Sequence, residues 1–343
     1  MLANTLYRHE QYKFGSQAAE EAEFRQHIVR VQSAQQELAR RHAPAVNRRV
    51  FHTKSHGCLM GTLTLRPDRP ASVRQGLFSD GGKQRYNVLA RFSNGVGEIR
   101  HDLKPDVRGI ALKIFGVQEG GSETSSVTEC CVDWLLTNSP NPFGRDQQEF
   151  VEFMEANLHP LTKLPVFLLE HPRVATLLLK ATSVPVASLA TQRYWSGHPY
   201  LLGPDRAMKF NLTPASGIAV GAVTELLGAN HLREDLLRRL KDGPVRFSLN
   251  VQLEVSPEVT PVEDALIEWE EAQSPSMPVA DLELTRELAG MDADALSFTP
   301  AHFIAAHRPL GNMARGRIFT YRASQEGRGA LPLDPPEQSL FAE

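Results

Sequence analysis

Near the carboxyl end of the chain, one aromatic hydroxyl lies between two arginines at helical spacing. Arg317 precedes Tyr321 by four residues, and Arg328 follows Tyr321 by seven. In an α-helix these offsets place the three side chains on one face. A free phenol has a pKa of about 10, and a neighbouring cation lowers a phenol's pKa by favouring its anion. A tyrosinate can bind ferric iron and serves as an axial ligand of haem. The plainer interpretation is an exposed amphipathic helix with scattered arginines.

Histidines and cysteines offer weaker signals. His52 and His56 are four residues apart, but on an extended strand that spacing is about 13 Å, too far to share one metal ion. The helical zinc motif, the phosphate-binding glycine loops and the hydrolase Gly-x-Ser-x-Gly turn are absent from the sequence. The three cysteines, Cys58, Cys130 and Cys131, have neither metal-ligand spacing nor the number needed for a disulfide framework. We therefore expect a reducing compartment.

Composition narrows the class of protein. The chain has 343 residues, of which 41% are hydrophobic and 22% charged, as in soluble globular proteins. Its net charge is -3, so no strongly basic field favours nucleic acid or anionic membrane as a partner. Met1–Phe14 lacks the apolar stretch of a secretory signal, and no apolar run is long enough for a membrane span. We expect a cytoplasmic protein.

The N-terminal part has helical periodicity. Apolar residues recur at three-, four- and seven-residue steps within Ser16–His42, and Pro44 marks the end of the pattern. We expect residues 1–44 to form a helical arm that packs against the main body or another subunit of a homo-oligomer. Residues 45–343 are expected to form a single domain.

The rest of the chain predicts an α+β protein. Segments with strand-like composition, separated by polar turns, occur at Arg49–Leu65, Val88–Ser93, Arg108–Phe115, Val132–Thr137, Lys209–Thr213 and Val245–Val255. The leucine-rich segment Gln147–Ala190 is predicted to be helical, with prolines interrupting it. The segment Pro257–Pro278 is predicted to be a connection. Strands early and late with helices between them favour a barrel or antiparallel sheet.

Four motifs, in order along the chain, resemble the haem catalase superfamily. Arg-Val-Phe-His-Thr-Lys from Arg49 is similar to that family's distal histidine strand, and Ala-Arg-Phe-Ser ending at Ser93 to its Val-Arg-Phe-Ser. Asp-Val-Arg-Gly from Asp106 is similar to Asp-Pro-Arg-Gly. Arg-Ile-Phe-Thr-Tyr ending at Tyr321 is similar to the proximal Arg-Ile-Phe-Ser-Tyr, with Arg328 at the family's second arginine position. The resemblance implies a catalase-like antiparallel β-barrel core with surrounding helices.

The resemblance also implies a ferric haem b cofactor and roles for individual residues. Tyr321 would be the axial iron ligand, held as phenolate by Arg317. His52 would be the distal acid–base group, oriented by Ser93. The other residues implied to contact the haem are Phe150 over its distal face and Arg49, Arg91 and Arg328 at its propionates.

The chain departs from the family pattern at the distal amide. Aligning the Ser-Pro that follows places Thr137 at the catalytic position, whereas a one-residue shift places Asn138 there. The chain ends soon after the proximal helix, and Tyr194–Gly203 is similar to small catalase-related proteins, a group that includes allene oxide synthases. Those synthases have threonine before the distal histidine, where this chain has Phe51.

These observations predict a haem-dependent hydroperoxidase that reduces hydrogen peroxide or organic hydroperoxides with a small-molecule reductant. A histidine with a pKa near 6.5 can take a proton from one peroxide oxygen and return it to the other. Two alternatives stay open. One is rearrangement of a fatty acid hydroperoxide without an external reductant, which the apolar segment Leu164–Leu189 favours. The other is a non-catalytic haem-binding protein.

Overall fold

The structure is a computed structural model that describes residues 6–41, 49–118, 129–217, 228–288, 296–330 and 341, with the backbone alone at 129 and 130. Its α-helices are α1 (Gln17–Arg41), α2 (Gln147–Asn157), α3 (Lys163–Glu170), α4 (Pro172–Thr182), α5 (His231–Asp242) and α6 (Gly311–Gly327). Its strands are β1 (Ser55–Leu65), β2 (Arg85–Asn94), β3 (Arg108–Gln118), β4 (Glu129–Thr137), β5 (Tyr194–Trp195), β6 (Tyr200–Leu202), β7 (Arg206–Pro214), β8 (Val245–Leu253) and β9 (Met277–Glu287). Four 3₁₀ turns cover Ala71–Val73, Gly76–Phe78, Leu189–Thr191 and Ala305–His307.

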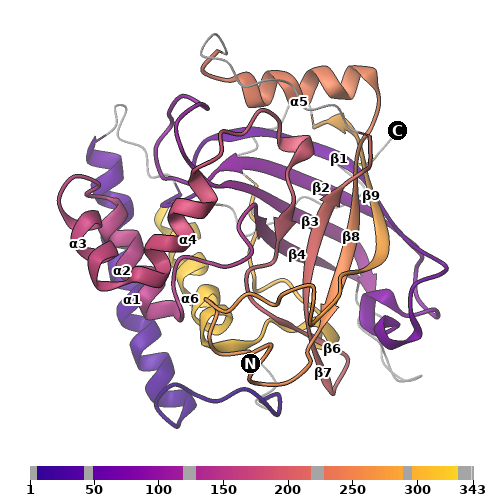
Figure 1. Cartoon of the computed structure of the whole chain (residues 1–343), viewed down its shortest axis with the longest axis horizontal. Coiled ribbons are helices and arrows are strands. Elements are labelled where there is room, and N and C mark those ends of the chain that lie inside the picture. The colour runs from indigo at the N-terminus through magenta and orange to yellow at the C-terminus, as the bar shows by residue number, and fades with distance from the viewer. Residues whose placement is uncertain are drawn as a thin grey trace.

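The strands form a closed antiparallel barrel. Their order is β5-β4-β3-β2-β1-β9-β8-β7, and β5 also pairs with β7, which closes the ring; β6 adds to β7. The closure is short, because β5 has two residues and pairs with β4 at Thr137 and with β7 at Asn211 and Leu212. The helices α1 to α4 and α6 gather on one side of the barrel, and α5 lies apart from them at its top (Figure 1). The predicted α+β class, with an antiparallel barrel core and surrounding helices, is confirmed.

Alternating residues of β2 to β4 divide between two buried environments. Phe92, Ile110 and Trp134 point into the barrel and belong to its main hydrophobic core. Their neighbours Arg91 and Ser93 are also buried, on the outer face. Because successive side chains of a strand point to opposite faces, the outer wall of β1 to β4 is itself covered. The candidate site lies against this outer wall.

The helical layer that covers the outer wall is tightly packed. The α1 residue Phe24 contacts Phe319 of α6, with ring centroids 5.4 Å apart. A Cβ atom at Gly316 of α6 would overlap the Gln147 side chain of α2, so only glycine permits this approach. The predicted arm therefore packs against the main body of its own chain. Its predicted helix end, His42, lies outside the described residues.

The helical prediction for Gln147–Ala190 holds in three pieces, because prolines divide it. Pro172 begins α4, and Pro165 lies in the first turn of α3, where the missing N–H costs no helical hydrogen bond. Helix α5 and strand β9 were not predicted: α5 is rich in charged residues, and β9 follows a proline- and acid-rich connection. Within the described residues, no helix has both the length and the apolarity needed to cross a bilayer.

Candidate active site

A cavity of about 410 Å³ lies between the outer wall of the barrel and the helical layer. This volume is within the range of sites for drug-sized ligands. Most of its wall is apolar, with Val50, Phe143, Val151 and Met154 among the lining residues. Nine of the ten residues predicted for the site line this cavity: Arg49, His52, Arg91, Ser93, Thr137, Phe150, Arg317, Tyr321 and Arg328.

His52 does not lie on a strand, contrary to the prediction. It precedes β1 in a turn and has a φ of 59°, the only described non-glycine residue with a positive φ. This backbone conformation is rare for residues with a side chain and clusters at functional sites. Two hydrogen bonds hold it: the His52 N–H donates to the Gly95 carbonyl at 2.8 Å, and Arg91 Nη2 donates to the His52 carbonyl at 3.0 Å. The turn aims the ring into the cavity.

The His52 ring is held from two sides. Its Nδ1 lies 3.0 Å from Ser93 Oγ, and the ring packs directly on Gly109, where a Cβ atom would lie 2.6 Å from Nδ1 and Cε1. Burial, followed by the positive charges of Arg91 and Arg317, lowers the pKa of His52 to about 3. The imidazole is therefore neutral at physiological pH. A neutral ring whose Nδ1–H donates to Ser93 keeps Nε2 as a proton acceptor.

On α6, Arg317 and Tyr321 interact as the helical spacing predicts. Arg317 Nη2 donates to Tyr321 Oη at 3.0 Å, and the guanidinium carbon lies 5.1 Å from the centroid of the phenol ring. Burial opposes protonation of Arg317, but the nearby Tyr321 and Tyr200 hydroxyls outweigh it and raise the pKa of Arg317. The guanidinium therefore stays charged beside the phenol. Arg328 lies just past the end of α6, at its C-cap, and lines the same cavity.

The charge of the cavity wall is strongly unbalanced. Among the residues that the structure describes, five arginines (Arg49, Arg91, Arg100, Arg317 and Arg328) and one acidic residue, Asp106, line it. Burial raises the pKa of that Asp106 carboxyl. An apolar cavity with excess positive charge fits a large apolar ligand that carries anionic groups. The residues present thus fit a haem, with its two carboxylates and flat hydrophobic ring.

Phe150 and Phe51 form part of the apolar wall near His52. Their ring centroids are 5.7 Å apart, and both line the cavity. Phe150 comes from α2, in which Asp146 caps the helix by accepting the Glu149 N–H. Because this cap fixes the start of α2, it also fixes the position of Phe150 one turn later.

The two candidates for the distal amide position occupy different places. Thr137 lines the cavity. Asn138 is not among the lining residues: its Oδ1 accepts the Arg108 N–H at 2.7 Å and its Nδ2 donates to Gln192 at 3.3 Å. Asn138 therefore serves to join the ends of β3 and β4. Of these two candidates, Thr137 is the one whose residue lines the cavity.

Two helices outside the barrel shape the apolar mouth of the cavity. Leu164 of α3 and Leu178 and Thr182 of α4 line it. Beside them Leu169 and Leu179 are exposed, at 84% and 70% of their surface. Helices α3 and α4 therefore add hydrophobic side chains to the cavity wall and to the surface beside it.

Sequence reasoning missed several lining residues. Gly109 belongs to a quoted motif, but only its contact with the His52 ring shows why a side chain is excluded there. Leu135 and Ala111, which face each other across β3 and β4, form the cavity floor together with Phe298. The sequence could have indicated Leu135, since it lies two residues before Thr137 and so on the same strand face. Nothing in the sequence indicated Phe298.

Comparisons with known proteins identify the family and the fold of the chain. A family model described as "Catalase" matches residues 25–332. A "Catalase-related peroxidase" of Mycolicibacterium paratuberculosis is 29% identical over 69% of this chain and 76% of its own length. A "Catalase" of Staphylococcus epidermidis is 24% identical over 84% of this chain, which spans 61% of that relative. Among solved structures, a fungal catalase superposes with a TM-score of 0.68 at 22% identity, covering 89% of this chain and 63% of its own. Catalase A of Saccharomyces cerevisiae superposes with a TM-score of 0.67 at 19% identity, covering 85% and 63%.

Proposed function

Because the chain belongs to the catalase family, we propose that it is a haem-dependent hydroperoxidase that reduces hydrogen peroxide or organic hydroperoxides with a small-molecule reductant. The observation that carries this proposal is that a neutral, oriented imidazole (His52) and an arginine-paired phenol (Tyr321) line one cavity. The similarity to a catalase-related peroxidase supports it.

The cavity residues have separate tasks in this proposal. Tyr321 would bind the iron, and Arg317 places a positive charge and a hydrogen-bond donor beside the Tyr321 oxygen. Arg49, Arg91 and Arg328 would bind the two carboxylates of a ferric haem b, and Phe150 would pack on the ring. When bound, haem supplies the redox-active iron that exchanges electrons with peroxide and reductant.

His52 moves the proton. Its Nε2 accepts a proton from one peroxide oxygen and delivers it to the other oxygen as the O–O bond breaks. Ser93 and Gly109 keep the ring in a single orientation, so proton transfer requires no reorganisation of the site. The depressed pKa of His52, caused first by burial, keeps Nε2 able to accept a proton over a wide pH range.

The outcome after the first peroxide depends on Thr137. An amide at this position can hold a second peroxide by two kinds of hydrogen bond, whereas a threonine hydroxyl offers a single rotatable group. The Thr137 hydroxyl also donates to the Ser139 carbonyl at 3.2 Å. We therefore propose that turnover with an external reductant exceeds disproportionation of hydrogen peroxide.

One observation favours a second candidate, rearrangement of a fatty acid hydroperoxide. The leucines of α3 and α4 that line the cavity mouth fit an acyl chain. Incubation with a fatty acid hydroperoxide in the absence of reductant separates the two candidates. An epoxide, aldehyde or ketol product would favour rearrangement, and the corresponding alcohol formed only with reductant would favour the peroxidase.

The site assignment is tested with the purified holoprotein, by its electronic spectrum before and after peroxide and by peroxide-dependent dye oxidation. We expect Tyr321→Phe to alter the haem spectrum and His52→Ala to keep it while slowing dye oxidation by about 10²-fold or more. Variants that oxidise dye as fast as the parent would contradict the assignment. Tight haem binding with no spectral response to any peroxide would instead favour a non-catalytic haem protein.

We further propose a cytoplasmic location, which fits the small number of cysteines. We also propose that the chain forms a homo-oligomer. Membership of the catalase family determines the fold of the chain but not the number of subunits.

A further inference from the structure

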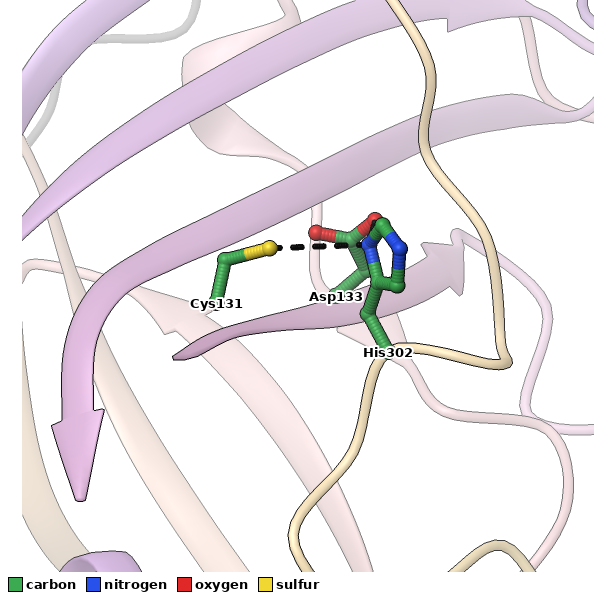
Figure 2. A group of neighbouring side chains, drawn as sticks. All are labelled: Cys131, Asp133 and His302. Atoms are coloured by element: carbon green, nitrogen blue, oxygen red, sulfur yellow. Dashed lines mark hydrogen bonds and ion pairs between the residues drawn. The ribbon is translucent and has the colours of Figure 1, made fainter. Parts of the chain in front are cut away.

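A second cluster of reactive side chains lies on the outer face of the barrel, beyond the candidate active site. Lys113 of β3 and Asp133 of β4 face each other in the strand register. Cys131 lies two residues before Asp133 and so points to the same face, and His302 approaches from the segment that follows β9. Figure 2 shows the three side chains of Cys131, Asp133 and His302 converging.

The cluster is separate from the cavity. None of its four members is among the residues that line the cavity. Phe298, which does line it, lies between the two sites: the Lys113 ammonium is 5.4 Å from the centroid of the Phe298 ring. A reaction at this cluster therefore needs no haem.

The contacts within the cluster join two cations, one carboxylate and one thiol sulfur. Lys113 Nζ lies 2.8 and 2.9 Å from the two Asp133 oxygens and 3.9 Å from Cys131 Sγ. His302 Nδ1 lies 3.0 Å from Asp133 Oδ2 and 3.5 Å from Cys131 Sγ. Lys113 and Asp133 are fully buried, whereas the His302 side chain is 32% exposed.

The histidine in this cluster is charged. Burial opposes its protonation, but the hydrogen bond to Asp133, followed by that to Cys131, outweighs burial and raises the pKa of His302 to about 10. Two positive charges, on Lys113 and His302, thus face one carboxylate. Cations beside a cysteine sulfur in general favour nucleophilic attack by that sulfur.

From this geometry we propose that Cys131 is a peroxide-reactive cysteine, a modification site that acts independently of the haem. Its substrate is the terminal oxygen of hydrogen peroxide or of a small organic hydroperoxide. Cys131 is partly exposed as a residue, and so is the His302 side chain, which gives a peroxide access to the cluster from solvent.

The step is a two-electron oxidation of sulfur. The thiolate attacks the terminal oxygen, so an S–O bond forms as the O–O bond breaks. The attacked oxygen keeps its hydrogen and yields the sulfenic acid. The leaving alkoxide, or hydroxide in the case of hydrogen peroxide, takes the proton of the His302 imidazolium and departs as the alcohol or water. The peroxide is the only oxidant needed.

A metal site is the competing interpretation of the same residues, since the three ligand atoms lie within 4.8 Å of one another. The Lys113 ammonium argues against it, because both carboxylate oxygens of Asp133 already contact a cation. In addition, Thr299 N–H donates to Asp133 Oδ2 at 2.9 Å. A divalent ion would have to displace these partners and the proton of His302.

The chain contains its own control for thiol reactivity. Cys58 lies on β1 and is buried, and burial raises its pKa to about 12. In a Cys130→Ser holoprotein at pH 7, limiting iodoacetamide followed by peptide mass spectrometry compares Cys131 directly with Cys58. We expect Cys131 to be alkylated at least about tenfold faster. Equal rates in the folded protein would overturn the proposal.

The oxidation itself is tested by adding one equivalent of hydrogen peroxide with dimedone, which traps sulfenic acid. We expect the label on Cys131 and not on Cys58, and we expect the same label in the Tyr321→Phe background. Loss of the label in that background would overturn haem independence. Failure of the proposed haem function would leave the label unchanged, so the two proposals can fail separately.

Two further measurements probe the role of His302. His302→Asn keeps a hydrogen-bond donor for Asp133 but removes the charge, and we expect alkylation of Cys131 to slow by about tenfold, with His159→Asn as the surface control. Unchanged alkylation in folded His302→Asn would contradict the assigned role. Stoichiometric zinc in the purified protein that is lost in Cys131→Ser would overturn the proposal in favour of a metal site.

Discussion

The His52 ring packs directly on Gly109 of β3: a Cβ atom at Gly109 would lie 2.6 Å from both Nδ1 and Cε1 of the imidazole. Real Cβ atoms do not approach so closely, so any side chain must push the ring away from the β3 strand. The same displacement would break the 3.0 Å contact between His52 Nδ1 and Ser93 Oγ. The absence of a side chain on β3 therefore contributes directly to the orientation of the proposed acid–base group.

The first prediction concerns this contact between Gly109 and the His52 ring. Gly109→Ala should slow peroxide-dependent dye oxidation on the order of 10²-fold, because a displacement of about 1 Å at a reacting group has that effect. The haem spectrum of the resting protein should change little. Gly81→Ala is the matched control, since a Cβ atom at Gly81 meets nothing within 4 Å. An active Gly109→Ala variant would show that the orientation of His52 does not limit the reaction.

The second prediction concerns the arginine beside the phenol. Arg317→Gln removes the positive charge that lies beside the Tyr321 oxygen, so we expect a shifted haem spectrum and activity lowered by about 10–100-fold, as for other residues that support a metal ligand. Arg322→Gln is the control, because Arg322 lies on the same helix with its side chain 81% exposed. Identical spectra for the parent and Arg317→Gln would contradict the role of Arg317.

The third prediction separates Thr137 from Asn138. Asn138→Ala removes hydrogen bonds at the ends of β3 and β4 and should lower the free energy of unfolding by about 1–3 kcal/mol. Thr137→Asn restores an amide in the cavity and should raise oxygen release from hydrogen peroxide relative to dye oxidation. Urea unfolding and an oxygen electrode provide the two readouts. Loss of oxygen release in Asn138→Ala, without loss of stability, would assign the distal position to Asn138.

The fourth prediction concerns substrate size. Leu178 lines the cavity mouth, whereas the adjacent Leu179 is 70% exposed. Leu178→Gln should raise the KM for cumene hydroperoxide by about tenfold, because an unpaired amide in an apolar wall disfavours an apolar ligand. The KM for hydrogen peroxide should change much less, and Leu179→Gln should change neither. Equal effects on both peroxides would show that the organic substrate does not pass this leucine.

The fifth prediction is that acid destabilises the fold through its buried histidines. Burial lowers the pKa values of His27, His56 and His307 to about 4, below the usual 6.5. Between these values the unfolded chain binds more protons than the folded chain, so the free energy of unfolding falls as pH falls from 6.5 towards 4. His302 acts at higher pH: its raised pKa makes its contribution decline as pH rises from 6.5 towards 10.

Urea unfolding at pH 7.5 and pH 5 measures this acid effect. His307 has partners on both ring nitrogens, Leu77 N–H at 3.0 Å and the Leu201 carbonyl at 3.2 Å, which suits the neutral ring. His307→Gln should therefore be less stable at pH 7.5 but lose less stability between the two pH values. A pH dependence as large as that of the parent would show that His307 does not contribute to it.

The proximal half of the candidate site was predictable because its geometry is local. A four-residue spacing on one helix suffices to bring Arg317 to Tyr321, since helical periodicity determines which side chains meet. The order of the motifs, from Arg49 to Arg328, likewise indicated the family and its barrel. These features depend on the residue types and their spacing alone.

The distal half depended on contacts between segments far apart in the chain. His52 reaches the cavity through a left-handed turn that no strand pattern indicates. Its ring packs on Gly109, which comes from β3. The register of β3 and β4 places Thr137 in the cavity, whereas Asn138 forms hydrogen bonds and does not line the cavity. It likewise brings Lys113 to Asp133, while His302 arrives from a distant segment. Residue identity and spacing thus determined helix α6 and the family. Long-range packing decided which side chains share a cavity, because such contacts form only when the barrel closes and its outer wall is covered.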